Sequence, residues 1–174
     1  MKAQYHALSA GIAAPMLIPV LGPYSAVFFA SSVLIDGDHY LDYLYRNGFK
    51  DFSVKRMFTF HKKLYENWKG KTFLGLNIGH TAEWLLLVYG AYAITDWMWL
   101  KAALWGMLFH MVFDLIYGYQ RKGLRRRALS IIEYIIRWNR MKRRGLHPEL
   151  PYTSTLRVMS GFSEGKIGKT KEDN

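Results

Sequence analysis

A long stretch without charge near the start of the chain restricts the possible folds most. No Asp, Glu, Lys or Arg occurs between Ala7 and Ile35. A helix that crosses a bilayer needs roughly 20 apolar residues, so this stretch is one long span or the larger part of two. The residues in its middle, Leu21-Gly22-Pro23-Tyr24, favour a turn because Gly-Pro breaks a helix. The sequence therefore predicts a helical hairpin, with helices over about 5–21 and 24–45.

A second apolar stretch, residues 72–119, carries charge only at Glu83, Asp96, Lys101 and Asp114. Its length suits two further spans. The predicted turn between them is Thr95-Asp96-Trp97, with Asp96 at a helix start and Trp97 as an interface anchor. The predicted fold class is thus all-α, an integral membrane bundle of about four helices in two hairpins. We expect this bundle, with a metal site, over residues 1–120.

Basic residues follow the second stretch and alternate with Ile and Trp over residues 121–144. This pattern favours a basic amphipathic helix on an anionic leaflet, which we expect over 121–146. The Gly-, Ser- and Lys-containing end of the chain predicts a flexible tail over 147–174.

The distribution of charge predicts an orientation. The chain has a formal net charge of +11, from 24 Lys and Arg against 13 Asp and Glu. With four spans, the N-terminus and the basic segments 46–71 and 121–144 lie on one side, which is cytoplasmic because basic loops stay inside. We expect a multi-pass protein of the inner (plasma) membrane with both termini in the cytoplasm. A soluble helical protein is the alternative, and a nucleic-acid-binding segment at 121–144 is the least favoured.

Ionisable residues in apolar helices are costly and indicate function. Their spacing places pairs on shared helix faces: Asp36 with His39, His80 with Glu83, and His110 with Asp114. The chain has no Cys, so a metal must be held by imidazole and carboxylate, which suits Zn²⁺, Mn²⁺ or Fe²⁺. The candidates exceed the needs of one ion, so one or two ions are expected. The candidate metal residues are His6, Asp36, Asp38, His39, His61, His80, His110 and Asp114.

Each of these residues has a simpler interpretation. His6 can be a helix cap or interface residue, His61 a solvated loop residue, and Asp42 an i,i+4 partner of Arg46. For the acids and histidines of the apolar helices, the alternative is a buried polar network without metal.

Three segments carry a family resemblance: His6-Ala-Leu-Ser-Ala-Gly, Leu34-Ile-Asp-Gly-Asp-His39 and His110-Met-Val-Phe-Asp114. They resemble the H-x-L-x-x-G, D-x-D-H and H-x-x-x-D motifs of a bacterial inner-membrane family of metal-dependent hydrolases, which is distantly similar to zinc-dependent phospholipase C. The resemblance covers roughly residues 6–118. It implies that the three motifs and a loop histidine bind metal. The loop motif of the family has two histidines. The segment at His61 contains only one of them, His80 is a candidate for the second, and either residue can be the ligand that the motif supplies.

The residues and the resemblance together lead to a functional hypothesis. We expect a hydrolase of an ester or phosphoester, acting near the lipid headgroups through one or two divalent ions, most simply zinc. Glu83 and Asp38 are the candidate catalytic residues, with Glu83 as general base because it shares a helix face with His80. Expected partners are membrane lipid and an anionic substrate, which Lys62, Lys63, Arg121 and Arg125 can attract. The alternative is a non-enzymatic metal- or proton-binding membrane protein.

Overall fold

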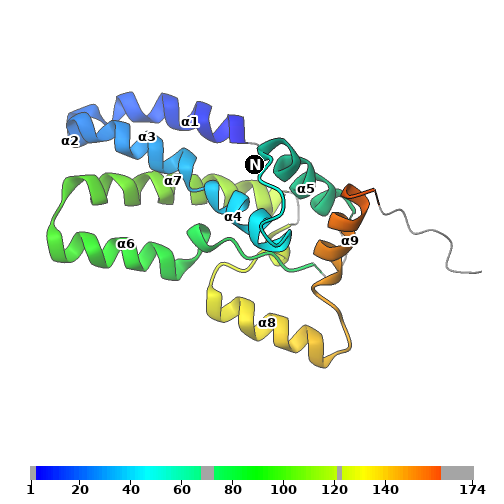
Figure 1. Cartoon of the computed structure of the whole chain (residues 1–174). Coiled ribbons are helices and arrows are strands. Elements are labelled where there is room, and N and C mark those ends of the chain that lie inside the picture. Colours follow the sequence, from blue (N-terminus) through cyan, green and yellow to red (C-terminus); the bar gives the residue numbers. More distant parts are fainter. Residues whose placement is uncertain (1–2, 68–72, 121–122, 162–174) are drawn as a thin grey trace, which may run out of the picture.

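The computed structural model describes residues 3–67, 73–120 and 123–161, and this part of the chain is all-helical (Figure 1). The elements are α1 (Ala3–Met16), α2 (Ile18–Leu21), η1 (Gly22–Tyr24), α3 (Ser25–Leu34), α4 (Gly37–Arg46), α5 (Val54–Asn67), η2 (Ile78–His80), α6 (Ala82–Thr95), α7 (Met98–Gln120), η3 (Leu124–Arg126), α8 (Ile131–Arg143) and α9 (Leu150–Met159). The all-α class predicted from the sequence is confirmed.

Four helices, α1, α3, α6 and α7, run side by side as an elongated bundle (Figure 1). Helix α7 packs against both α3 and α6, and α1 packs against α3. Gly106 permits the closest of these approaches, because a Cβ atom there would collide with the carbonyl oxygen of Phe28 and with Ser31 Oγ. Small residues at such positions let helix backbones come close.

Both predicted turns occur where local chemistry indicated them. The first contains Gly22, whose φ of +54° is a left-handed conformation that glycine adopts readily. The second contains Asp96, which ends α6 rather than starting α7. Its φ is +53°, and its backbone N–H bonds to the carbonyl oxygen of Tyr92. The helix-start role expected for Asp96 is therefore wrong.

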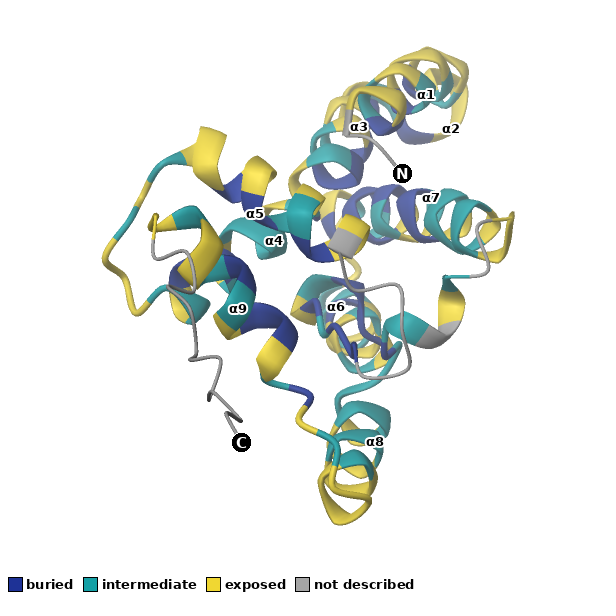
Figure 2. Ribbon diagram, turned by 90° about the vertical axis from the view of Figure 1, so that its right-hand side faces the viewer, coloured by how far each residue is buried: buried dark blue, intermediate teal, exposed yellow. Residues whose placement is uncertain are grey.

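Two segments are long and apolar enough to cross a membrane, Ile18–Arg46 and Met98–Gln120. Only 22% and 39% of the residues in their most apolar windows are buried, so much apolar surface faces outward (Figure 2). Helix α6 is shorter than the span expected from residue 72 onward, because it begins only at Ala82 and residues 73–77 are not helical. Helix α1 ends at Met16. A complete set of four spans thus stays a prediction.

A second helical group lies at one end of the bundle and comprises α4, α5 and α9 (Figure 1). Its core consists of Tyr43, Met57, Phe60, Leu64, Phe73 and Tyr152. Helix α9 falls inside the flexible tail predicted over 147–174, and that prediction is wrong for residues 150–159. The segment folds because Tyr152 is 2% exposed and donates a hydrogen bond to the carbonyl oxygen of Leu74 at 2.7 Å. Residues 162–174 lie outside the described part.

The predicted amphipathic helix is present as α8, over 131–143 rather than 121–146. Ser130 caps it by accepting hydrogen bonds from the N–H groups of Ile132 and Glu133. No residue of α8 is buried, and Ile132, Ile135 and Ile136 are all more than half exposed. Before α8, Arg127 is extended and forms an isolated β-bridge with Gly75.

Candidate metal centre

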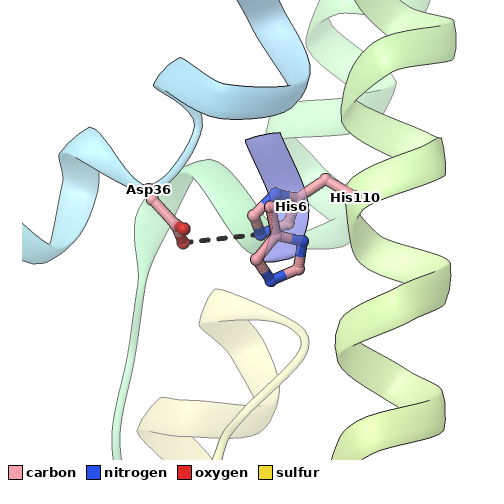
Figure 3. Close-up of side chains that lie close together, drawn as sticks. All are labelled: His6, Asp36 and His110. Carbon is pink, nitrogen blue, oxygen red and sulfur yellow. Dashed lines mark ion pairs between the residues drawn. The ribbon is translucent and has the colours of Figure 1, made fainter. Parts of the chain in front are cut away.

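Five of the predicted metal residues meet at one end of the bundle, although they come from different elements. His6 lies in the first turns of α1, Asp36 at the break between α3 and α4, and His80 in η2. His110 and Asp114 lie one turn apart on α7. Potential ligand atoms lie within 4.8 Å of one another in two groups, His6–Asp36–His110 and His80–His110–Asp114. Figure 3 shows the first group, with the His110 ring beside that of His6 and facing Asp36. These groups can hold a metal ion.

Hydrogen bonds fix the orientation of the two central rings, the imidazoles of His80 and His110. His110 Nδ1 lies 2.7 Å from the carbonyl oxygen of Ser32, which can only accept, so Nδ1 carries the proton. His80 Nδ1 lies 2.8 Å from Asp38 Oδ2 and donates to it likewise. The two Nε2 atoms are 3.1 Å apart. In neutral imidazoles these Nε2 atoms are both acceptors, so their lone pairs repel unless a cation lies between them.

Two carboxylates flank this pair of nitrogens. Asp36 Oδ1 lies 3.4 Å from His110 Nε2 and 3.6 Å from His80 Nε2. Asp114 Oδ2 lies 3.7 and 3.8 Å from the same two atoms. A tetrahedral zinc site, with bonds of about 2.0–2.2 Å, separates its ligand atoms by about 3.3–3.6 Å. Each of the two carboxylates therefore lies from the two ring nitrogens at nearly the spacing of ligand atoms around a divalent ion.

His6 adds a further nitrogen to the cluster. Its ring stacks on that of His110, with centroids 3.7 Å apart and planes inclined by 14°. His6 Nε2 lies 3.0 Å from Asp114 Oδ1 and donates to it. His6 Nδ1, then an acceptor, is buried and has no hydrogen-bond partner among the described residues. An orphaned acceptor beside two carboxylates is an atom that a cation can satisfy.

Asp38 lies behind His80 rather than in either ligand group. A carboxylate that accepts from the second ring nitrogen of a metal-binding histidine fixes its tautomer and raises its basicity. Gly79 packs closely against this contact, and a Cβ there would lie 3.2 Å from Asp38 Oδ2, so the carboxylate would have to shift by a few tenths of an ångström. The arrangement differs from the expectation that Asp38 itself binds metal.

His39 and His61 belong to neither ligand group. The Asn77 amide nitrogen lies 2.9 and 3.0 Å from the Nδ1 and Nε2 atoms of His39, and His61 Nε2 donates to the carbonyl oxygen of His39 at 2.9 Å. Burial lowers the pKa of the His61 imidazole. Of the two histidines that stand in place of the loop motif, the structure brings His80 into the cluster and leaves His61 behind His39.

Glu83, expected as the general base, binds to the start of α8 instead. Its carboxylate accepts hydrogen bonds from the Ser130 hydroxyl at 2.5 Å and the Ile131 N–H at 3.0 Å, at the start of α8. A carboxylate at a helix N-terminus is stabilised by the backbone N–H groups and the helix dipole. His80 lies in η2, before α6 begins, so the helix face that the two residues were expected to share does not exist.

Arg127 was not predicted as a residue of the site. Its Nη1 donates to Asp114 Oδ2 at 2.8 Å, which ties the guanidinium to the cluster. Arg127 lies in a run of three arginines, and nothing in the pattern distinguishes it from its neighbours. Asp42 pairs with Arg46 at 3.1 Å, as the simpler interpretation of that residue expected. Arg121 lies outside the described residues.

No protein-family model, curated protein or solved structure matches this chain. The resemblance to inner-membrane hydrolases therefore stays a prediction.

Proposed function

We propose that this protein is a membrane-bound, metal-dependent hydrolase that cleaves an ester or phosphoester at the cytoplasmic end of its helical bundle. The observation that carries the proposal is the 3.1 Å separation of His80 Nε2 and His110 Nε2, while both Nδ1 atoms are committed to other acceptors. With Asp36 and Asp114 alongside, the donors suit Zn²⁺ first and Mn²⁺ or Fe²⁺ next.

The residues of the chain have distinct roles in this proposal. A divalent ion at such a site activates water and polarises the oxygen of the group under attack. Asp38 and the Ser32 carbonyl hold the two central rings in the required tautomer. Arg127 holds Asp114 by a charge-assisted hydrogen bond. Glu83 has no role as a base in this proposal, because its oxygens are occupied at α8.

The proposed location rests on the outward-facing apolar residues and on α8. Leu86, Leu87 and Ile94 of α6 are each more than 60% exposed, as expected of a helix surrounded by lipid. Helix α8 combines exposed isoleucines with Arg140, Lys142 and Arg143 in its last turn, which suits an anionic leaflet. A site at this end of the bundle would lie near the headgroup layer, within reach of lipid-linked substrates.

Elemental analysis of the detergent-purified protein tests the metal. We expect about one or two equivalents of Zn, Mn or Fe in the wild type and in His147→Ala, whose imidazole is 65% exposed and far from the cluster in sequence. His110→Ala should lose the metal, because His110 belongs to both ligand groups. Metal in the wild type justifies assays with phosphodiester and phospholipid substrates. A wild type that stays empty after reloading refutes the proposal.

The same geometry favours one second candidate, a non-enzymatic proton site. A separation of 3.1 Å between two imidazole nitrogens also suits a shared proton between the rings. This reading requires a wild type that excludes metal and whose ring-nitrogen NMR signals show a protonated His80–His110 pair at neutral pH.

A further inference from the structure

A cavity of about 560 Å³ opens beside the metal cluster. His39 and Asp114 line it on the cluster side. Three further lining residues are basic, Lys62, Arg126 and Arg127, and one is acidic, Glu66. Four are aliphatic or thioether side chains, Met111, Leu115, Leu124 and Leu129, and the remainder are Tyr65, Tyr117, Gly118 and Gly123. The volume is that of a pocket for a small molecule.

Arg127 is the basic residue that joins this cavity to the cluster. Its Nη1 atom is bound to Asp114 Oδ2 at 2.8 Å. Its Nε and Nη2 atoms are buried and have no hydrogen-bond partner among the described residues. In a guanidinium group, the N–H bonds of Nε and Nη2 form one edge, pointing the same way, and this edge matches two oxygens of a carboxylate or phosphate. Buried donors of this kind are costly to leave unpaired.

The backbone around Arg127 is held firmly. Gly75 N–H donates to the carbonyl oxygen of Arg126 at 2.8 Å, and Ala128 N–H donates back to that of Gly75 at 3.0 Å. Ala128 is fully buried. The backbone that carries the Arg127 side chain is therefore held by hydrogen bonds on both sides, which lowers the entropic cost of binding a ligand.

We infer that Arg127 binds the anionic group of the substrate through its Nε/Nη2 edge, and that the cavity accepts an anionic amphiphile, a lipid phosphoester. The inference rests on the proposed function for the reaction itself. Asp114 also lines the cavity and is bound to Arg127, so an anion that Arg127 binds there lies beside the cluster. The apolar lining at Met111, Leu115, Leu124 and Leu129 would cover the first carbons of a chain.

Binding of short-chain lipids to the full-length protein in detergent, freed of metal by a chelator, tests this inference separately from hydrolysis. The probes are dioctanoyl phosphatidate, the neutral dioctanoylglycerol and inorganic phosphate, followed by calorimetry. We expect the phosphatidate to bind most tightly. Arg127→Lys should weaken it about tenfold or more, because lysine keeps the charge but lacks the two-donor edge. Arg157→Lys is the matched control, since it makes the same change at an exposed position of α9, and it should bind like the wild type.

A second variant separates the two parts of the ligand. Leu115→Trp fills the apolar part of the cavity and should weaken phosphatidate while leaving inorganic phosphate unchanged. Circular dichroism establishes that each variant is folded. Equal affinity of the wild type and Arg127→Lys for phosphatidate overturns the inference, as does equal binding of phosphatidate and dioctanoylglycerol. Arg127-dependent binding to a protein that never takes up metal would support this inference and refute the hydrolase proposal.

Discussion

Asp38→Asn distinguishes a ligand from a residue that supports one. The substitution keeps size and shape, and the Asn carbonyl oxygen can still accept from His80 Nδ1 at the observed 2.8 Å. It removes the negative charge, so the hydrogen bond weakens and His80 Nε2 becomes a poorer donor to metal. Losing such a supporting partner typically lowers metal affinity about 10- to 100-fold, or about 1.4–2.7 kcal/mol.

Competition with a chromophoric chelator measures this change on the detergent-purified protein. Asp96→Asn is the matched control, because Asp96 is exposed at the opposite turn and asparagine tolerates its positive φ. We expect an unchanged affinity for Asp96→Asn, an intermediate loss for Asp38→Asn and complete loss for His110→Ala. If Asp38→Asn loses metal as completely as His110→Ala, Asp38 is a direct ligand and our reading of the geometry is wrong. No loss at all would mean that the Asp38–His80 contact does not act on a metal site.

Three further predictions concern packing and the membrane. Gly106→Ala should destabilise the bundle by about 1–3 kcal/mol through collision with α3, measured by denaturant unfolding in detergent, whereas Gly90→Ala meets open space and should not destabilise it. Because the chain has no Cys, Ile135→Cys can carry one environment-sensitive dye, whose emission should shift to the blue with anionic vesicles and revert at high salt; no shift would refute lipid contact by α8. Thiol labelling of Asp96→Cys and Arg140→Cys in intact and inverted vesicles should find them on opposite sides, and labelling from the same side would contradict the topology.

The turns of the two helical hairpins could be predicted from short segments of the sequence. Gly22-Pro23 and Asp96 interrupt stretches with almost no charge, and a turn at each point follows from the few residues around it. The tail prediction failed for the opposite reason. Helix α9 is ordered by the contacts of Tyr152 with residues far away in sequence, such as Leu74, and no periodicity within the helix reveals them.

The members of the candidate metal cluster were predictable in part, and their arrangement was not. Five of the eight predicted metal residues lie in the two ligand groups, and the i,i+4 spacing of His110 and Asp114 placed them on one helix face. The contact of Asp38 with His80 joins residues 42 positions apart in the chain, and no local pattern predicts it. The expected pairing of His80 with Glu83 assumed that both lie in one helix, and the helix begins only at Ala82.

The balance of charge around the cluster favours a divalent ion over a shared proton. Asp36, Asp38 and Asp114 are all less than a quarter exposed, and Arg127 pairs with Asp114 at 2.8 Å. Carboxylates gathered in a buried site repel one another, so added positive charge stabilises them. A divalent ion adds two positive charges, whereas a proton shared by His80 and His110 adds one. A divalent ion also accepts the lone pairs of both Nε2 atoms, which face each other at 3.1 Å, and it can bind Asp36 and Asp114 directly. The shared proton reaches only the two rings, so the metal ion satisfies more of the groups that converge here.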